Sequence, residues 1–323
     1  MKELACLIVI AWYTAVFSFQ PSDSTQRYFR HSVKKGETVS LICIDLYGRY
    51  TNEMGKVILK ENPSVKNINV IFVGQDLQMH NPAFKAASAA KKEELFEKKI
   101  SFTQGVVTYV EGDVWMFPKG ASAKQQCNPN TIVNPGDVIR TGANGRAELI
   151  INRETVVRIK ENTKLVVEAF RDNEKNTGKT QIGFSVGSVW AKMKKFKDKI
   201  SRFDLELPTA IAGVHGTVYE ATIGNDSSSE VKVFAGEVAV KNNPAITGQS
   251  EGEVAGPGEV SGPSEVSMEQ WVSIVRDMQK ISIDKKGNPR PVEQFKRNEV
   301  DSWEQWNYQR DKRIAQMFEE TEE

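Results

Sequence analysis

The chain contains little of the chemistry on which enzymes and metal proteins depend. It has 3 cysteines and 3 histidines in 323 residues. None of His31, His80 and His215 has a second histidine, a cysteine or a carboxylate cluster nearby at the spacing of metal ligands. Neither a Gly-x-Ser-x-Gly elbow nor a phosphate-binding glycine loop occurs in the sequence. The sequence therefore predicts a protein that is not an enzyme and that holds no metal and no cofactor.

An excess of charge of either sign is also missing. The 43 lysine and arginine residues balance 42 aspartate and glutamate residues, which leaves a formal net charge of +1. Dedicated nucleic-acid binders carry a clear basic excess, so no nucleic-acid partner is expected. Hydrophobic residues make up 39% of the chain, which is enough for real cores. The length favours two or more domains.

The sequence contains a single long hydrophobic run. Residues 4–19 form an almost unbroken apolar segment, which is typical of a secretory signal peptide. Residues 1–18 are predicted to be removed by cleavage after Ser18. The alternative is an uncleaved membrane anchor, but the run is short for a bilayer span. The mature chain is thus expected in the periplasm or cell envelope, exported, with no integral membrane segment after cleavage.

Too few cysteines remain in the mature chain for a disulfide framework. Cys43 follows the apolar face of a predicted helix, where it is expected to be part of a core. Cys127 lies in a polar segment. A thiol dyad of Cys127 and His215 is the alternative, but the sequence signatures of cysteine peptidases are absent around both residues. An ordinary loop thiol is therefore preferred.

Residues 28–80 have the pattern of a compact unit with two strands and two helices. A turn at Gly36 precedes a helix whose N-cap is Thr38, and Gly48 ends this helix. The Asn-Pro pair at 62–63 ends the second helix. The predicted order is strand, helix, helix, strand, carried by "RYFRHSV", "TVSLICIDLYG", "NEMGKVILKENP" and "DLQMH".

This unit resembles the lysin motif, LysM. The resemblance rests on residues 33–39, 46–48, 61–63 and 73–77, which agree with the family in order and spacing. LysM modules bind glycans that contain N-acetylglucosamine, so the resemblance implies peptidoglycan or a chitin-like glycan as a partner. The shallow groove of the family lies between two loops and corresponds here to Gly36, Glu37, Thr38, Val39, Asn67, Ile68, Asn69 and Val70.

A structural role is the alternative for these residues. Sugars need hydrogen-bonding groups beside apolar surfaces, and the two loops contain both. Gly36 and Thr38 would otherwise form only the turn and the helix cap, and Ile68 and Val70 would only pack. The two roles are compatible with each other.

The sequence changes its character after residues 81–100, which are rich in Ala, Lys and Glu and are predicted to be a linker. Residues 101–241 contain short runs that alternate with period two and break at Gly, Asn and Asp. They predict a glycine-rich all-β domain, either a sandwich or a solenoid. The element Gly-x-Val recurs in it, with glycines that favour positive φ before a strand, at Gly105, Gly112, Gly187 and Gly236.

This predicted β domain resembles the FecR domain. The clearest segment is residues 204–221, "DLELPTAIAGVHGTVYEA", with support from residues 135–142 and from the closing "VFAGEVAVK". FecR domains are named for a transmembrane iron-transport signalling protein that controls a sigma factor. The sequence shows no cytoplasmic helix bundle before the domain and no mid-chain membrane helix, so the signalling role is not expected to transfer. The resemblance implies an exported β scaffold that contacts an unknown envelope protein.

The remaining sequence is predicted to be a low-complexity segment and a helical tail. Residues 242–267 are rich in Gly, Pro and Glu, and residues 268–323 are helical by composition. Trp303, Trp306 and Ile314 are expected to share one face of the last helix, with its charges solvated. So large an apolar area predicts docking on the β domain, with a dimer or partner interface as the alternative.

The predicted fold class is multidomain, α+β and all-β: a small βααβ LysM module, a FecR-like β domain and a helical C-terminal tail. The predicted function is that of a non-enzymatic cell-envelope protein that binds peptidoglycan through the module and presents the β domain for protein or envelope contacts. One alternative is an envelope signalling or transport regulator related to FecR sensors. A further alternative is an accessory factor of a wall hydrolase.

Overall fold

A computed structural model describes several stretches of the chain. They are residues 25–84, 94–97, 105–151, 155–170, 179–193, 202–214, 216–243, 272–296 and 301–319. The predicted signal peptide, most of the predicted linker 81–100 and most of the low-complexity segment 242–267 lie outside these residues. The predictions made for those three segments therefore remain predictions.

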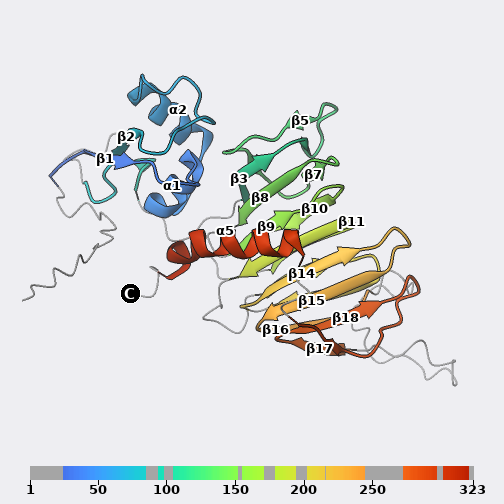
Figure 1. Cartoon of the computed structure of the whole chain (residues 1–323). Coiled ribbons are helices and arrows are strands. Elements are labelled where there is room, and N and C mark those ends of the chain that lie inside the picture. The colour runs from blue at the N-terminus through green and yellow to red at the C-terminus, as the bar shows by residue number, and fades with distance from the viewer. Residues whose placement is uncertain are drawn as a thin grey trace, which may run out of the picture.

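The N-terminal part of the structure is a small module, residues 28–80, with the order strand, helix, helix, strand (Figure 1). Its elements are β1 (Tyr28–Ser32), α1 (Val39–Tyr47), α2 (Asn52–Glu61) and β2 (Asp76–His80). The two strands pair antiparallel, with Tyr28 opposite His80. The element order predicted for these residues is confirmed, although such an order does not by itself assign a family.

Local sequence explains where the two helices begin and end. The Thr38 hydroxyl accepts a hydrogen bond from the Leu41 N–H at 3.2 Å, and the Thr51 hydroxyl accepts one from the Met54 N–H at 3.2 Å. These caps satisfy donors that have no partner inside the helix. Helix α1 ends at Gly48, whose φ of 77° lies in the left-handed region that glycine adopts without strain.

The β domain is one 17-stranded sheet that curls into two layers. Its strands are β3 (Gly105–Glu111), β4 (Val114–Phe117), β5 (Gln125–Gln126), β6 (Ile132–Val133), β7 (Val138–Thr141), β8 (Arg146–Ile151), β9 (Thr155–Ile159), β10 (Lys164–Ala169), β11 (Lys179–Met193), β12 (Arg202–Glu206), β13 (Ala210–Val214), β14 (Val218–Ile223), β15 (Ser229–Ala235), β16 (Glu237–Asn242), β17 (Val272–Arg276), β18 (Gln279–Ile283) and β19 (Glu293–Gln294). The first layer runs β6-β3-β8-β9-β11-β14-β15-β18-β19, and the second runs β5-β4-β7-β10-β11-β12-β13-β16-β17.

Strand β11 belongs to both layers. Its first half pairs with β10 and, in parallel, with β12, whereas its second half pairs with β9 and β14. The change of layer occurs at Gly187, which has a φ of 100° and where a Cβ atom would lie 2.1 Å from the Thr163 hydroxyl. A residue without a side chain is therefore required at this bend.

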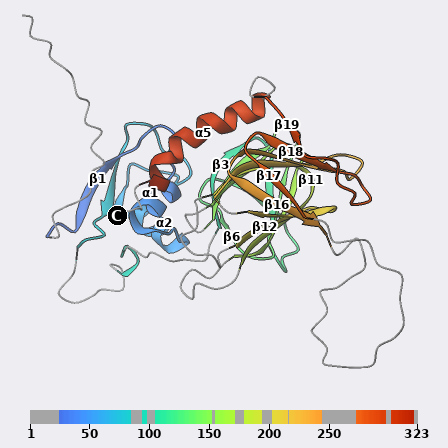
Figure 2. The ribbon, with the colours of Figure 1, turned by 90° about the horizontal axis from the view of Figure 1, so that it is seen from below.

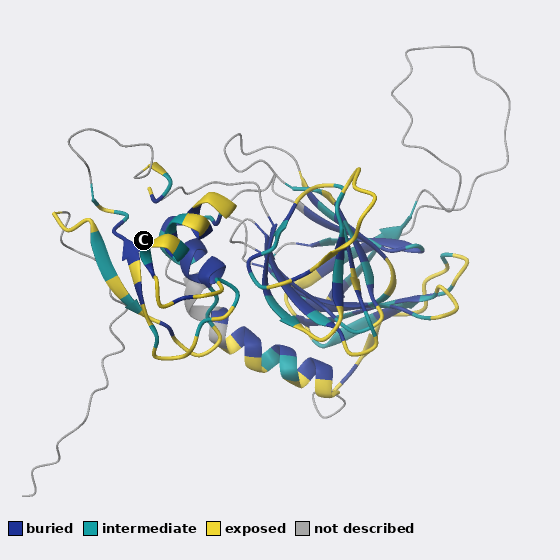
Figure 3. Cartoon of the chain, turned by 90° about the horizontal axis from the view of Figure 1, so that it is seen from above, coloured by how far each residue is buried: buried dark blue, intermediate teal, exposed yellow. Residues whose placement is uncertain are grey.

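One apolar core fills the space between the layers, and many residues of the strands around it are dark blue, that is buried, in Figure 3. Val107, Leu149 and Val189 point into it from the first layer, and Ile139 and Leu165 point into it from the second. A shared core between two layers agrees with the sandwich alternative rather than with a solenoid.

The prediction of helix throughout residues 268–323 is wrong at its beginning. Residues 272–283 form β17 and β18, and the β domain extends to β19, beyond the predicted end at residue 241. Val275, Ile281 and Ile283 are buried in the core, so alternation of apolar residues decides the structure here.

Helix α5 (Ser302–Glu319) lies across the outer side of the first layer and runs from the β domain toward the module (Figure 2). Trp303, Asn307 and Arg310 are buried on the β domain, which confirms the predicted docking. The prediction that the charges of this helix are solvated is wrong for Glu304 and Asp311. Both are buried because they pair with Lys232 and Arg158 of the sheet.

The module and the β domain share a second apolar core. It joins the buried side chains of α1, α2 and β2 to Val106, Ile150 and Val156 of the sheet and to Ile314 of α5. The ring of Phe96 stacks on His80 with centroids 3.9 Å apart. The module is therefore packed against the sheet and α5 rather than tethered to them. In the part of the chain that is described, no helix combines the length and the apolar character needed to cross a bilayer.

Candidate functional site

The loop between β1 and α1 contains the first half of the predicted glycan site. Gly36 has a φ of 90°, as its predicted turn requires. Glu37 Oε2 accepts a hydrogen bond from the Lys34 N–H at 2.7 Å and lies 2.9 Å from His31 Nε2. Burial acts to raise the pKa of Glu37, but the bonds to His31 and Lys34 outweigh it and lower that pKa below its ordinary value. Glu37 is thus an ionised part of the loop structure.

Two other residues of this loop have structural roles. The hydroxyl of Thr38 caps α1 and lies 3.1 Å from the Ser40 hydroxyl. Val39 is 1% exposed and belongs to the module core. Val39 therefore has a structural role. The side chain of Thr38 is half-exposed and lies at the rim of the predicted groove.

The loop before β2 contains the second half of the predicted site. Asn67 Oδ1 accepts a hydrogen bond from the Asn69 N–H at 3.0 Å, which closes a local turn. Ile68 is half-buried and packs on the module core. Val70 is 49% exposed, and Phe72 and Val73 beside it are each 68% exposed. This loop therefore presents apolar side chains to solvent, next to its amides.

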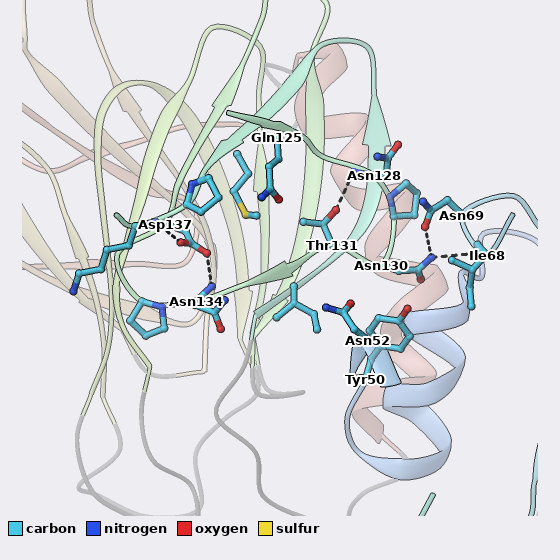
Figure 4. A pocket seen from close by; sticks show the side chains of 16 residues that line it. Tyr50, Asn52, Ile68, Asn69, Gln125, Asn128, Asn130, Thr131, Asn134 and Asp137 are labelled. Atoms are coloured by element: carbon cyan, nitrogen blue, oxygen red, sulfur yellow. Dashed lines mark hydrogen bonds between the residues drawn. The ribbon is translucent and has the colours of Figure 1, made fainter. Parts of the chain in front are cut away.

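The structure brings the two predicted loops together through a residue that the sequence did not single out. Asn130, from the loop between β5 and β6, is 5% exposed and lies between them. Its Oδ1 accepts a hydrogen bond from the Ser40 N–H at 2.7 Å. Its Nδ2 donates to the Ile68 carbonyl at 3.2 Å and to Asn69 Oδ1 at 2.9 Å (Figure 4). The groove predicted from the sequence is thus occupied by the β domain.

An open cleft of about 630 Å³ adjoins Asn130, between the module and the β domain. Figure 4 shows side-chain amides from both parts of the chain along it. Its polar lining consists mostly of uncharged amides, with Lys119 as its cation; the amides are Asn52, Asn69, Gln125, Asn128, Asn130 and Asn134. The apolar part consists of Tyr50, Ile68, Met116, Ile132 and three prolines. The carboxylate of Asp137 is already bonded to the Lys119 and Asn134 N–H groups. The cleft suits a neutral polar ligand.

A second polar cluster lies under helix α5, on the outer side of the first layer. Glu148 is fully buried and pairs with Arg158 at 2.7 Å and with Arg310 at 2.8 Å. Arg158 also pairs with Asp311 at 2.7 Å. Burial acts to raise the pKa of Glu148, but the two guanidinium groups outweigh it and lower that pKa to about 2. Each charge of this cluster is paired with an opposite one, although Arg158 Nη2 is buried without a hydrogen-bond partner among the described residues, so the cluster has a structural role.

Glu220 is a buried carboxyl with a different environment. Its Oε1 lies 2.5 Å from the Ser188 hydroxyl. Burial raises the pKa of Glu220 to about 7, and the nearby charge of Glu304 acts in the same direction. Glu220 therefore stays protonated at a pH at which ordinary carboxyl groups are ionised. It faces α5 and no cleft, so it does not qualify as a catalytic acid.

The thiols offer no nucleophile. Cys43 is buried as predicted. Cys127 lies in the loop between β5 and β6, as predicted, but it is 1% exposed and belongs to the core of the β domain. Burial raises the pKa of Cys127 to about 12. His215, the other member of the dyad considered above, lies outside the described residues. In the described part of the chain, no three His, Cys, Asp or Glu side chains are grouped in a way that suits a metal ion.

Helix α5 covers only the first layer, so the second layer has a face of its own. Its outward side chains on β4, β7 and β10 are half-buried or exposed, and we call them the open face: Trp115, Phe117, Val138, Arg140 and Val166. Lys124 Nζ lies 3.9 Å from the centroid of the Trp115 ring, and Arg140 Cζ lies 4.7 Å from that of Phe117. Aromatic rings topped by cations are common at protein interfaces.

Comparison with known families identifies most of this β domain. Residues 137–239, which run from the start of the β7 segment into β16, match the family model described as FecR protein. This part of the chain is a FecR domain. The FecR match does not include the module, so the LysM resemblance of residues 28–80 remains a prediction.

Comparison with solved structures finds two structures of a candidate anti-sigma factor from Parabacteroides distasonis ATCC 8503. Each is 14% identical in sequence, covers 51% of this chain and 63% of its own, and has a TM-score of 0.36. This chain therefore spans less than two thirds of the length of that protein. No curated protein sequence matches the chain.

Proposed function

We propose that this chain is a non-enzymatic protein of the cell envelope that regulates signalling through protein contacts of its FecR domain. The observation that carries the proposal is the FecR match of residues 137–239. The sequence alone placed glycan binding first and regulation second, and the match reverses that order. Sensing, rather than attachment to the wall, becomes the main role of the chain.

The open face supports this proposal as the contact surface. It combines two aromatic rings with aliphatic and cationic side chains, which is the composition enriched in protein interfaces. The other face of the domain is already covered by α5. A partner that recognises the FecR domain therefore has the second layer available to it.

Measurement of transcript levels in the source cell tests the proposed regulatory role. Deletion of the protein is expected to change a defined set of envelope transcripts, and the wild-type chain is expected to restore them. A variant with Trp115→Ala and Phe117→Ala should fold normally, because its substitutions lie on the outer side, and should fail to restore those transcripts. Val292→Ala, at a valine that is 36% exposed in the segment between β18 and β19 and outside the open face, serves as the control. Unchanged transcripts after deletion contradict a regulatory role.

Glycan binding by the module is a second candidate function. The observation that favours it is the exposed apolar group Val70, Phe72 and Val73, which lies beside the amides of the predicted loop. Such a surface suits the apolar face of a sugar ring. Shallow grooves bury little of a ligand, so dissociation constants of about micromolar to millimolar are expected for short oligomers.

Sedimentation with purified peptidoglycan tests this second function. The full chain is expected to sediment with the sacculi, and Phe72→Ala with Val73→Ala should lose much of this retention at an unchanged melting temperature. Val292→Ala again serves as the control. Equal sedimentation of all three proteins would argue against binding by this loop.

A further inference from the structure

The carboxamide of Asn130 is held in place by the β domain. The Asn130 N–H donates to the Val107 carbonyl at 2.8 Å, which fastens its backbone to β3. Its φ of 77° lies in the left-handed region, which asparagine tolerates better than other residues with side chains. The backbone of the residue is thus attached to the sheet, and its side chain points to the module.

In the part of the chain that the structure describes, Asn130 is hydrogen-bonded to the Ser40 N–H and to the Ile68 carbonyl of the module. The Ser40 N–H belongs to the first turn of α1, where N–H groups have no acceptor inside the helix. The Ile68 carbonyl lies in the opposite loop. An N–H on one side and a carbonyl on the other bind any planar amide that offers an oxygen and an N–H together. The acetamido group of an N-acetylated sugar has the same two functions as the asparagine side chain.

We propose that Asn130 is an internal occupant of the module groove, so that the β domain and an N-acetylated sugar compete for one position. This proposal rests on the glycan binding proposed above as the second function. The Ser40 N–H and the Ile68 carbonyl bind Asn130 in the closed state and the acetamido group in the open state. Glycan binding then requires the side chain of Asn130 to leave.

The neighbouring cleft gives a ligand a route to this position. Its volume of about 630 Å³ holds several sugar hydroxyl or ring groups, and Ile68 and Asn69 line both the cleft and the contact with Asn130. A glycan strand that first meets the amides of Asn52 and Asn128 therefore arrives beside the closed groove. The cleft carries little charge, as a neutral sugar requires.

Competition of this kind couples the two proposed functions. A ligand that displaces Asn130 removes three hydrogen bonds between the module and the β domain. Linkage between the two equilibria is reciprocal. Asn130 lowers the affinity for the sugar by a certain factor, and bound sugar weakens the contact between Asn130 and the module by the same factor. Occupation of the groove is thereby transmitted to the FecR domain, and the chain reports on the state of the glycan.

The experiment compares the full-length wild type with Asn130→Gly in binding to the tetramer of N-acetylglucosamine. Glycine accepts the positive φ, so this variant removes the carboxamide without backbone strain. It is expected to bind the tetramer about tenfold more tightly, because the closed state no longer reduces the competent population. In the wild type, titration with the tetramer should move the side-chain amide signals of Asn130 in the NMR spectrum to those of a solvated asparagine.

Two further variants keep the test decisive. Gln126→Ala changes an exposed amide side chain at the end of β5, just before the same loop and outside the cleft lining, and should leave the affinity unchanged. Asn130→Asp keeps the size of the side chain and the acceptor for the Ser40 N–H, but it loses both Nδ2 bonds and places an anion against the Ile68 carbonyl and Asn69 Oδ1. It should therefore bind more tightly than the wild type and less tightly than Asn130→Gly. This variant replaces the glycine variant if the latter does not fold.

The outcomes separate this proposal from the one on which it rests. Equal binding by the wild type and both Asn130 variants, or a bound tetramer with unchanged Asn130 signals, overturns the competition and leaves glycan binding intact. Absence of binding in every variant overturns both. Tighter binding by the Asn130 variants alone, together with the shift of the wild-type signals, supports the competition.

Discussion

Arg310 and Glu148 are 162 positions apart in the chain and form a two-point ion pair, with Nε 3.0 Å from Oε2 and Nη2 2.8 Å from Oε1. Both side chains are buried where α5 meets the first layer. Helix α5 is therefore held by charges as well as by its aromatic rings. Charges that are buried in this way stabilise a contact only while each has its partner.

Substitution Glu148→Gln is expected to lower the free energy of unfolding by about 3–5 kcal/mol, because it removes the buried carboxylate that Arg158 and Arg310 share. Arg158 keeps its pair with Asp311, whereas the ion pair of Arg310 is lost. Denaturant unfolding measures this loss. Glu237→Gln is the control, since Glu237 also pairs with an arginine, at 3.2 Å, but in a pair whose side chains are 56% and 63% exposed. That change should cost no more than about 1 kcal/mol. Equal losses would mean that water reaches the network around Glu148.

The two indoles of α5 should contribute unequally to its docking. Trp303 is 1% exposed and stacks on Trp306, with ring centroids 5.2 Å apart, whereas Trp306 is half-buried. Trp303→Ala is expected to cost about 3–5 kcal/mol and Trp306→Ala clearly less. Melting temperature and oligomeric mass are measured for each. An unchanged melting temperature with an altered mass would indicate an interface between chains in place of intramolecular docking.

Stability should depend on pH through Glu220. Its pKa in the folded chain is about 7, above its ordinary value of 4.5, so between these values the folded chain binds more protons than the unfolded chain. The free energy of unfolding therefore falls as the pH rises through about 7, by about 3 kcal/mol at most. Glu220→Gln removes this contribution. A variant with the same slope between pH 5 and pH 8 as the wild type would show that another group is responsible.

The glycines of the β domain should differ in their tolerance of a side chain. A Cβ atom at Gly236, where φ is 90°, would lie 2.9 Å from the Gly216 carbonyl oxygen and 2.6 Å from Thr217 Cγ2. Gly236→Ala is expected to cost about 2–4 kcal/mol, from backbone strain and overpacking together. Gly120 has a φ of 75° and no atom within 4 Å of such a Cβ, so Gly120→Ala carries only the strain, about 1 kcal/mol. Thermal unfolding of the pair separates the two contributions.

Short-range chemistry explains what the sequence predicts well. Thr38 and Gly48 define the ends of α1 through contacts within a few residues, and such signals are visible in the sequence itself. The strands between β3 and β16 follow from alternation and turn residues in the same way. The helical face with Trp303 is also periodic, so its docking is predictable.

Long-range pairing explains the features that could not be predicted from the sequence. Residues 272–283 become strands because β15 and β16 offer them open edges, which no local pattern records. Glu304 is buried because it forms an ion pair with Lys232 on β15. Asn130 is missed for the same reason: the "NPN" at 128–130 indicates a turn that tolerates positive φ, but its contact with the module depends on how the two parts pack.

The position of α5 also determines the order in which the chain matures during synthesis. Every strand that α5 covers leaves the ribosome before it, so the outer side of the first layer is at first hydrated, with Glu148 and Arg158 in water. The two layers pair without α5 and can form early. Ile314 of α5 belongs to the core shared with the module, so attachment of the module is completed only when this helix arrives. A nascent chain is therefore expected to hold a finished β domain and a loosely attached module until the last turns of α5 have been translated.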